Sequence, residues 1–288
     1  MNARAAESRR GILDPRRGET RFTLTRFDPS PGLAGLVDRY WFVRWDLRGQ
    51  PPYAQETLTY PQVNLVFGTH RPGVFGAGTK RFVAMLEGEG WVIGAKFRPG
   101  GFRPFWRGSV SELTDRSISV TEAFGAPGAD VEAAVHAARA SDAPPEHCIA
   151  LIEAFLRARA PEPDDDVALA ARVVALAEHD PAIARVTDLA ERTGLTVRKL
   201  QRLFASHVGV SPRWVLRRFR VHEAAERVAR GEVTDWSALA CELGYFDQAH
   251  FIREFKAQTG RTPGEYAALC AASGSGSGSD SGSGSGTK

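Results

Sequence analysis

One segment of the chain occurs twice, about fifty residues apart. Residues 189–195 (LAERTGL) are matched by residues 239–245 (LACELGY). Further along, the offset becomes 51, because residues 209–212 (GVSP) correspond to residues 260–263 (GRTP). A single match of this length could arise by chance, but two copies in register are much harder to obtain. The repeat therefore predicts two structural units of one kind between about residues 170 and 268.

Each copy has the pattern of two short helices joined by a glycine turn. Gly194 and Gly244 stand where the first helix must end, at positions that often need a left-handed backbone. Thr196 and Asp247 follow, and both are good N-caps for a second helix. Apolar residues then recur at helix-compatible spacing, which turns one helix face inward. They are Leu200, Leu203 and Phe204 in the first copy and Phe251, Ile252 and Phe255 in the second. Each copy is thus predicted to be a helix-turn-helix, whose second helix enters the major groove of DNA.

Residues 167–268 resemble the DNA-binding domain of the AraC/XylS family of transcription regulators. The resemblance is most specific at residues 235–256 (DWSALACELGYFDQAHFIREFK) and 259–266 (TGRTPGEY). Residues 200–204 (LQRLF) match the first unit equally well, and residues 94–102 (GAKFRPGGF) are similar to the amino-terminal sensor-like domain of one subgroup. The resemblance implies an α+β chain, with a β-rich, cupin-like barrel followed by an all-α domain that carries both helix-turn-helix units. It also implies a transcription regulator without catalytic activity, catalytic residues or a cofactor.

The side chains expected to contact bases point away from the apolar face of each second helix. Arginine pairs with guanine and glutamine with adenine through two hydrogen bonds each, so both residue types suit base recognition. Ala249 departs from the polar residue that the family usually has, and is expected either to contact a thymine methyl group or to make no contact. The candidates are Arg198, Lys199, Gln201 and Arg202 in the first unit and Gln248, Ala249, His250 and Arg253 in the second.

A basic segment follows the first unit. Residues 196–220 hold seven basic residues and no acidic one. Such a segment attracts polyanions, so Arg213, Arg217 and Arg218 are predicted to hold phosphates or the groove edge. Family architecture implies that a long helix, from about Pro212 to Arg230, joins the two units. At 1.5 Å per residue it would span about 27 Å, of the order of one DNA turn.

The remainder of the chain divides by composition. Short runs of β-branched and aromatic residues separated by turn residues indicate a barrel or sandwich, and paired prolines with four carboxylates mark the best domain boundary. The predicted divisions are a disordered basic tail at 1–20, a β-rich domain at 21–125, a helical region at 126–160, an acidic proline-rich linker at 161–166, the double helix-turn-helix domain at 167–270 and a disordered Ser/Gly tail at 271–288.

Two interpretations of the amino-terminal half stay open at this stage. Its aromatic residues could line an effector pocket, although aromatic residues in strands are more often plain core. In the 126–160 region, Ile152, Phe155 and Leu156 form an apolar stripe that either makes a dimer surface or covers the barrel. A catalytic cupin needs clustered histidines, and this half offers only His70 before residue 130.

Composition excludes other classes. The three cysteines lie far apart and the histidines form no ligand pattern, so no metal site is expected. No apolar run reaches the ~18 residues that a membrane helix requires, and no secretory signal is found. The expected partners are double-stranded DNA and, as candidates, a small-molecule effector, RNA polymerase and a second copy of the chain, all in the cytoplasm and without a membrane. A purely architectural DNA-binding protein is the competing hypothesis, which sequence-selective binding would distinguish.

Overall fold

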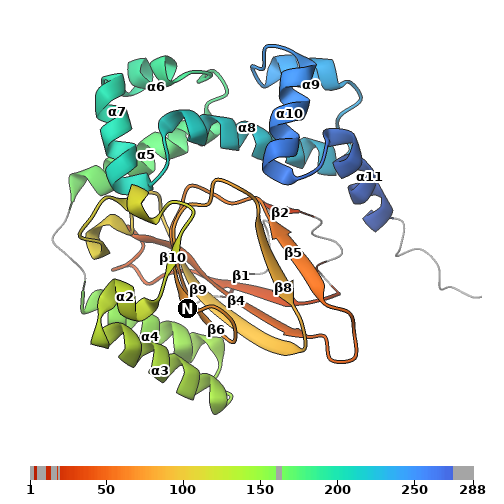
Figure 1. The fold of residues 1–288 in the computed structure, drawn as a ribbon. Helices are drawn as coiled ribbons and strands as arrows, with labels where there is room; N and C mark the ends of the chain where they lie inside the picture. Colours follow the sequence, from red (N-terminus) through yellow and green to blue (C-terminus); the bar gives the residue numbers. More distant parts are fainter. Residues whose placement is uncertain (1–2, 5–10, 14–17, 19, 160–163, 275–288) are drawn as a thin grey trace, which may run out of the picture.

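The computed structural model describes residues 3–4, 11–13, 18, 20–159 and 164–274 (Figure 1). Within them, an antiparallel β part is followed by a helical part, which is the predicted α+β order. No helix among these residues is both long and apolar enough to cross a lipid bilayer.

The β part contains two antiparallel sheets. The larger has seven strands in the order β1-β3-β4-β9-β6-β7-β10, and the smaller has three in the order β2-β5-β8. The longest pairing joins β4 to β9, and both strands come from sequence runs rich in aromatic and β-branched residues, which favour a pleated, half-buried surface. The strands are β1 (Ala3–Arg4), β2 (Ile12–Leu13), β3 (Thr23–Phe27), β4 (Val37–Asp46), β5 (Tyr53–Thr57), β6 (Asn64–Gly68), β7 (Gly73–Phe75), β8 (Phe82–Leu86), β9 (Glu89–Phe97) and β10 (Ser117–Ile118).

Three helices pack against the larger sheet. Ile152, Phe155 and Leu156 are buried there, in one cluster with strand residues such as Phe67 and Phe97. The apolar stripe of this region therefore covers the barrel, and its interpretation as a dimer surface is wrong. The elements between the sheets and the helical part are η1 (Arg103–Phe105), η2 (Val110–Leu113), α2 (Val120–Phe124), α3 (Ala126–Ala140) and α4 (Pro145–Arg157).

The helical part is built around α8 (Pro212–Ala229), an 18-residue helix. Figure 1 shows one helical hairpin, α6 with α7, at one end of α8 and a second, α9 with α10, at the other, while the sheets lie along the opposite side of α8. At 1.5 Å per residue, α8 spans about 27 Å, as predicted for the connector. The remaining elements are α5 (Asp165–His179), α6 (Val186–Thr193), α7 (Val197–Leu203), the π-helix η3 (Phe204–Val208), α9 (Trp236–Glu242), α10 (Gln248–Thr259) and α11 (Pro263–Gly274).

Parts of both predicted tails lie in regular secondary structure: β2 in the amino-terminal one and the end of α11 in the carboxy-terminal one. Ile12 and Leu13 pair with β5, and Leu13 is buried in a cluster with Leu58 and Val221. Disorder is therefore the wrong prediction for these two residues, because an apolar pair inside a basic segment has an apolar partner. At the other end α11 continues through Gly274, into the region assigned to the Ser/Gly tail. The remaining residues of that tail, 275–288, lie outside the described residues.

Candidate nucleic-acid interface

The first unit has the geometry that its sequence predicts. The Gly194 backbone is left-handed, with a φ of 66°, and ends α6. The hydroxyl of Thr196 then accepts a hydrogen bond from the Lys199 amide at 3.2 Å and opens α7. Leu200 and Phe204 are fully buried, which fixes how far the helix is rotated about its axis. The opposite face of α7 is consequently turned outward.

The second unit repeats this arrangement. Gly244 again has a positive φ, 71°, after α9. Asp247 caps α10 by accepting a hydrogen bond from the His250 amide at 2.6 Å. Phe251 and Phe255 are fully buried and hold α10 against its neighbours. The two copies therefore use the same turn, the same type of cap and buried phenylalanine or leucine side chains, but Glu254 stands where the first copy has Leu203.

The outward faces of α7 and α10 carry the residues singled out for base contacts. All eight have exposed side chains, and the sheets cover none of them. They are Arg198, Lys199, Gln201 and Arg202 on α7, and Gln248, Ala249, His250 and Arg253 on α10.

The three arginines of α8 have different surroundings. Arg213 is exposed. Arg217 is about half exposed and donates from Nε to the buried carboxylate of Glu254 at 2.8 Å, a bond that raises the pKa of Arg217. Arg218 is fully buried: its Nη2 donates to the Thr79 carbonyl at 2.6 Å, and its guanidinium lies 4.6 Å from the Trp214 ring centre. A phosphate contact is therefore the wrong prediction for Arg218 in this conformation.

Burial has a consequence for the charge of Arg218. It lowers the pKa of the guanidinium to about 10, and the Nε and Nη1 atoms have no hydrogen-bond partner among the described residues. Two buried donors without acceptors are unfavourable by about 1–3 kcal/mol each. Arg218 is thus a costly residue at the contact between the helical part and the sheets.

Glu254 links the second recognition helix to α8. Its carboxylate accepts from Arg217 and also from Gln258 at 3.1 Å, and it lies 3.6 Å from His250 Nε2. The His250 ring packs edge-on against Tyr245, with ring centres 5.4 Å apart. These contacts set the direction of His250 before any ligand is bound.

Phe246 is the residue of this surface that sequence analysis missed. It is 93% exposed and directly precedes the Asp247 cap of α10. Leu195 is followed at once by its cap, Thr196, whereas Tyr245 is followed by one extra residue, Phe246. This insertion is what changes the repeat offset from 50 to 51, so the change of offset could have identified it. An exposed aromatic ring beside a recognition helix can contact thymine methyl groups or sugars.

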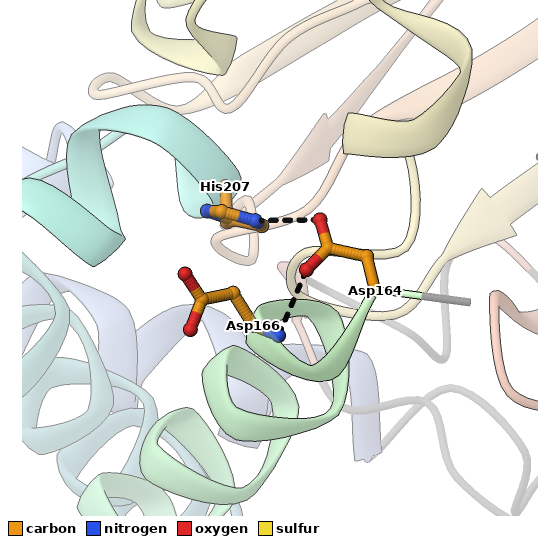
Figure 2. A group of neighbouring side chains, drawn as sticks. All are labelled: Asp164, Asp166 and His207. Carbon is orange, nitrogen blue, oxygen red and sulfur yellow. Dashed lines mark hydrogen bonds and ion pairs between the residues drawn. The ribbon is translucent and has the colours of Figure 1, made fainter. Parts of the chain in front are cut away.

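Asp164, Asp166 and His207 form the group of possible metal ligands in the described part of the chain (Figure 2). The Asp164 carboxylate accepts from the Asp166 amide at 2.9 Å and lies 3.3 Å from His207 Nε2. Burial raises the pKa of Asp164, but these two bonds outweigh it and the pKa falls. Because Asp164 caps α5, the electropositive start of that helix disfavours a cation there. The group is explained by helix capping and by the contact between α5 and η3.

The β part contacts the helical part near both ends of α8 and in the middle, mainly through loops between its strands. At one end, Thr114 Oγ1 donates to the Gly209 carbonyl at 2.5 Å, just after α7 and η3. In the middle lie the Arg218–Thr79 bond and a 3.2 Å contact between His222 Nε2 and the Thr59 carbonyl.

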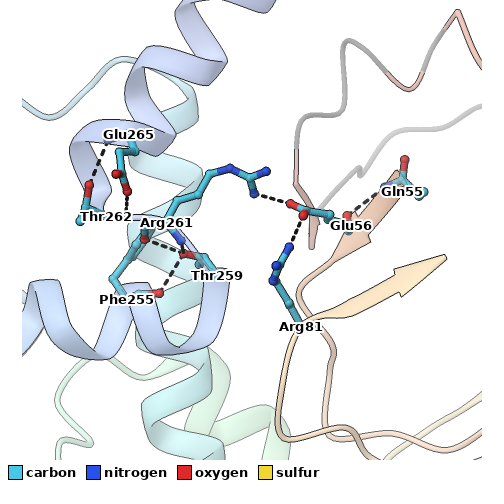
Figure 3. Close-up of polar contacts among 8 residues, drawn as sticks. All are labelled: Gln55, Glu56, Arg81, Phe255, Thr259, Arg261, Thr262 and Glu265. Carbon is cyan, nitrogen blue, oxygen red and sulfur yellow. Dashed lines mark hydrogen bonds and ion pairs between the residues drawn. The ribbon is translucent and has the colours of Figure 1, made fainter. Parts of the chain in front are cut away.

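At the other end, the Glu56 carboxylate on β5 forms ion pairs with two arginines, as Figure 3 shows. One is Arg81, which comes just before β8, and the other is Arg261, which follows α10. The β part thus holds both helix-turn-helix units in one relative orientation while leaving their recognition faces exposed.

Comparisons with known proteins agree with this division. A family model described as a helix-turn-helix domain matches residues 189–268, and one described as a domain of unknown function (DUF6597) matches residues 25–119. The transcriptional activator RhrA of Rhizobium meliloti is 32% identical over 88 residues, which are 31% of this chain and 28% of that protein. The chain therefore aligns with well under half of that relative.

Solved structures of ToxT from Vibrio cholerae are also similar. A crystal structure of ToxT bound to a naphthalenyl butenoic acid covers 87% of this chain and 99% of its own, with 12% identity and a TM-score of 0.41. A structure of ToxT with bound unsaturated fatty acid has 12% identity, coverages of 87% and 96%, and a TM-score of 0.38.

Two helix-turn-helix units on one connecting helix, with basic and amide side chains exposed on both, are the architecture of a helix-turn-helix DNA-binding protein. The helix-turn-helix match covers the region in which the sequence resembles the AraC/XylS family, and the curated relative RhrA carries the name of a transcriptional activator.

Proposed function

We propose that the chain recognises a specific duplex sequence by placing α7 and α10 in successive major grooves on one DNA face. One observation carries this proposal: both helices expose base-contacting residue types, and a single continuous helix of about 27 Å joins their units. Successive major grooves on one face are about 34 Å apart. One chain therefore suffices for two half-turns of DNA.

The exposed arginine, lysine and glutamine side chains have distinct roles in this proposal. Arg198 and Arg202 donate to guanine and Gln201 bonds adenine, since these pairings use two hydrogen bonds each. On α10, Gln248 and Arg253 have the equivalent roles, and Phe246 supplies an apolar contact. The other exposed basic residues of α7 and α8 are assigned to phosphate contacts. These are Lys199, Arg213 and the free face of Arg217.

Selection of bound duplexes from a random library tests the whole proposal. The expected site has two conserved segments about ten base pairs apart, each protected in the major groove. Because α8 is one rigid connector, inserting either five or ten base pairs between the segments should reduce affinity to the level of one segment. Equal binding to all sequences would support the architectural alternative and reject sequence-selective regulation.

Arg202 is the residue to test individually. Replacing it with alanine should weaken binding to the selected site by about 1–3 kcal/mol and relax the preference at one base pair. Arg192 provides the matched control, because it is an exposed arginine of the same unit that lies on α6 and pairs with Asp180. Equal losses on selected and random DNA would reject the assigned role of Arg202.

We also propose that a small organic anion bound to the β part regulates the chain. A cavity of about 430 Å³ lies between η1, α2 and the end of α4, and no carboxylate is among the residues that line it. Its lining combines guanidinium groups with aromatic rings: Arg103, Arg107, Arg159, Phe105, Trp106 and Phe124. A carboxylate with an apolar body suits this combination.

Matched probes test the regulatory site. 4-Phenylbutyrate should raise the melting temperature of the chain, and 4-phenylbutanol, which lacks the charge, should not. Replacing Arg159 with glutamine should remove the difference between the two probes. Identical responses to both compounds would reject an anion site in this cavity.

The curated relative RhrA carries the name of a transcriptional activator. Activation is therefore the direction of regulation to test first, with RNA polymerase as the partner. Transcription in vitro from a template that carries the selected site should increase when the chain is added. A decrease would indicate repression instead.

A further inference from the structure

Strand β8 exposes an apolar surface that nothing described so far uses. Among the described residues, four large apolar side chains are notably exposed, and three of them are on this strand. Phe82 is 47% exposed, Val83 42% and Met85 55%. An exposed apolar cluster of this kind on a strand marks an interaction site or an aggregation hazard.

The strand also has an unpaired edge. In the described part of the chain, β8 pairs only with β5 and stands last in the order β2-β5-β8. Proteins usually protect such an edge with a charge, a proline or a bulge, and residues 82–86 (FVAML) contain none of these. Exposed backbone groups next to exposed apolar side chains favour the addition of another strand.

We propose that this edge pairs with the same edge of a second copy of the chain, antiparallel and about a two-fold axis at Ala84. Antiparallel pairing about that axis sets residue i opposite residue 168 − i of the second copy, so Val83 faces Met85. Side chains two apart share a face of the sheet, which puts Val83 and Met85 of both copies side by side. Two three-stranded sheets then become one sheet of six strands.

Charges at the two ends of the strand identify the occupant as a second copy. Arg81 precedes β8 and Glu87 follows it, and both lie on the face of Val83 and Met85 because the period is two. The antiparallel arrangement places Arg81 opposite Glu87 of the second copy, twice per dimer. Parallel pairing would put like charges together. One nitrogen of Arg81 already bonds Glu56, and the others can bond the second carboxylate.

Charge variants test both the interface and its direction. Sedimentation equilibrium of the full chain without DNA should show a dimer. Arg81→Glu alone and Glu87→Arg alone should each weaken it by about tenfold or more, because like charges then face each other at both ends. Mixing the two variants should restore the dimer, since each pair again joins opposite charges. A monomeric wild-type chain, or a mixture that stays monomeric, would overturn the proposal.

A cross-link tests the register independently of any folding defect in the charge variants. Paired residues of antiparallel strands have Cα atoms about 4.5–5.5 Å apart, which suits a disulfide. In a Cys241→Ser, Cys270→Ser background, Ala84→Cys should form a covalent dimer on mild oxidation. Gln55→Cys is the control, because Gln55 is opposite Ala84 on the inner strand β5 and should stay uncoupled. A dimer that forms without the Ala84 cross-link would show another interface and sink this one.

Both experiments measure the oligomeric state of the chain without DNA. A negative result would therefore reject this dimer and would not bear on the proposed DNA recognition.

Discussion

At the scale of single residues, Arg202 and Arg218 show how two arginines of one basic segment differ. Arg202 is exposed on α7, whereas Arg218 is buried against the β part with two unpartnered donors. We predict that Arg218→Met, which keeps most of the side-chain volume, changes the free energy of unfolding by less than about 1.5 kcal/mol or increases it. Arg218→Ala should lower it by about 2–4 kcal/mol through lost packing. Denaturant unfolding of both variants checks the prediction.

The basic residues of α7 and α8 show which side-chain orientations the sequence can predict and which it cannot. Alternation between inward and outward faces is visible along α7, because the inward residues are apolar. Arg217 and Arg218 are adjacent and both basic. They differ by a rotation of about 100° around the helix axis, and that rotation decides which of them the β part covers. Only the position of the β part determines that it is Arg218. Had Arg218 contacted phosphate, Arg218→Met would weaken DNA binding as strongly as Arg202→Ala does, and that result would contradict the buried assignment.

Lys96 of β9 predicts a pH dependence of stability. Burial lowers its pKa from 10.5 to about 8, and Arg39 adds to this while Asp38 and Glu178 oppose it. Its Nζ lies 4.3 Å from the ring centre of Tyr60. Between about pH 8 and 10.5 the unfolded chain holds this proton and the folded chain does not, so this residue makes stability rise with pH there. Below pH 8 the charged lysine costs about 3 kcal/mol.

Lys96→Met should therefore stabilise the fold at pH 7 and flatten the rise between pH 8 and 10.5. Lys80, which is exposed, is the matched control, and Lys80→Met should change neither quantity. The measurement is the free energy of unfolding in urea at several pH values. A wild-type profile parallel to that of Lys96→Met would contradict the lowered pKa.

At the scale of elements, the repeat made the two helix-turn-helix units predictable in detail. Turn glycines, caps and inward apolar residues are local features that two copies make recognisable, whereas the buried Glu254 is a polar residue that no apolar pattern predicts. The covering of the barrel by Ile152, Phe155 and Leu156 was not decidable in the same way. An amphipathic helix shows that a partner exists, but its sequence does not say whether that partner is the sheet or another chain. The edge pairing of Ile12–Leu13 was missed because a two-residue strand leaves no periodic pattern.

The helix ends give a matched pair of glycine variants. Gly194 has a φ of 66° and open space around its Cα, whereas Gly209 has a φ of 97° and an added Cβ would lie 3.2 Å from the Val110 carbonyl oxygen. Gly194→Ala should cost about 1–2 kcal/mol for the left-handed backbone alone. Gly209→Ala should cost more, because η2 of the β part must also move. Thermal unfolding of the two variants measures the difference, and equal losses would show that the contact with Val110 is easily relaxed.

At the scale of the whole molecule, the β part determines how the two recognition helices stand relative to each other. It contacts the helical part beside Gly209, along α8 and at Arg261. The sequence predicts two domains joined by an acidic linker, and nothing in it indicates how they contact each other. Contacts between distant segments, such as the one between Glu56 and Arg261, carry no pattern in a single sequence. This is why the exposed faces of α7 and α10 could be predicted and their mutual orientation could not.

Glu56 is the point at which this orientation can be released. Its largely buried carboxylate separates two arginines, so Glu56→Ala leaves Arg81 and Arg261 near each other without an acid between them. We predict that amide hydrogen exchange in residues 259–266 then speeds up by about tenfold or more, since a lost ion pair and a new repulsion together correspond to at least ~1.4 kcal/mol. Exchange in α6 and α7 should stay unchanged, because these helices contact the β part at the other end of α8. Glu242→Ala is the control: it breaks an ion pair with Arg227 that lies within the helical part. If both variants loosened residues 259–266 equally, general destabilisation would explain the effect, and the second unit would owe its orientation to α8 alone.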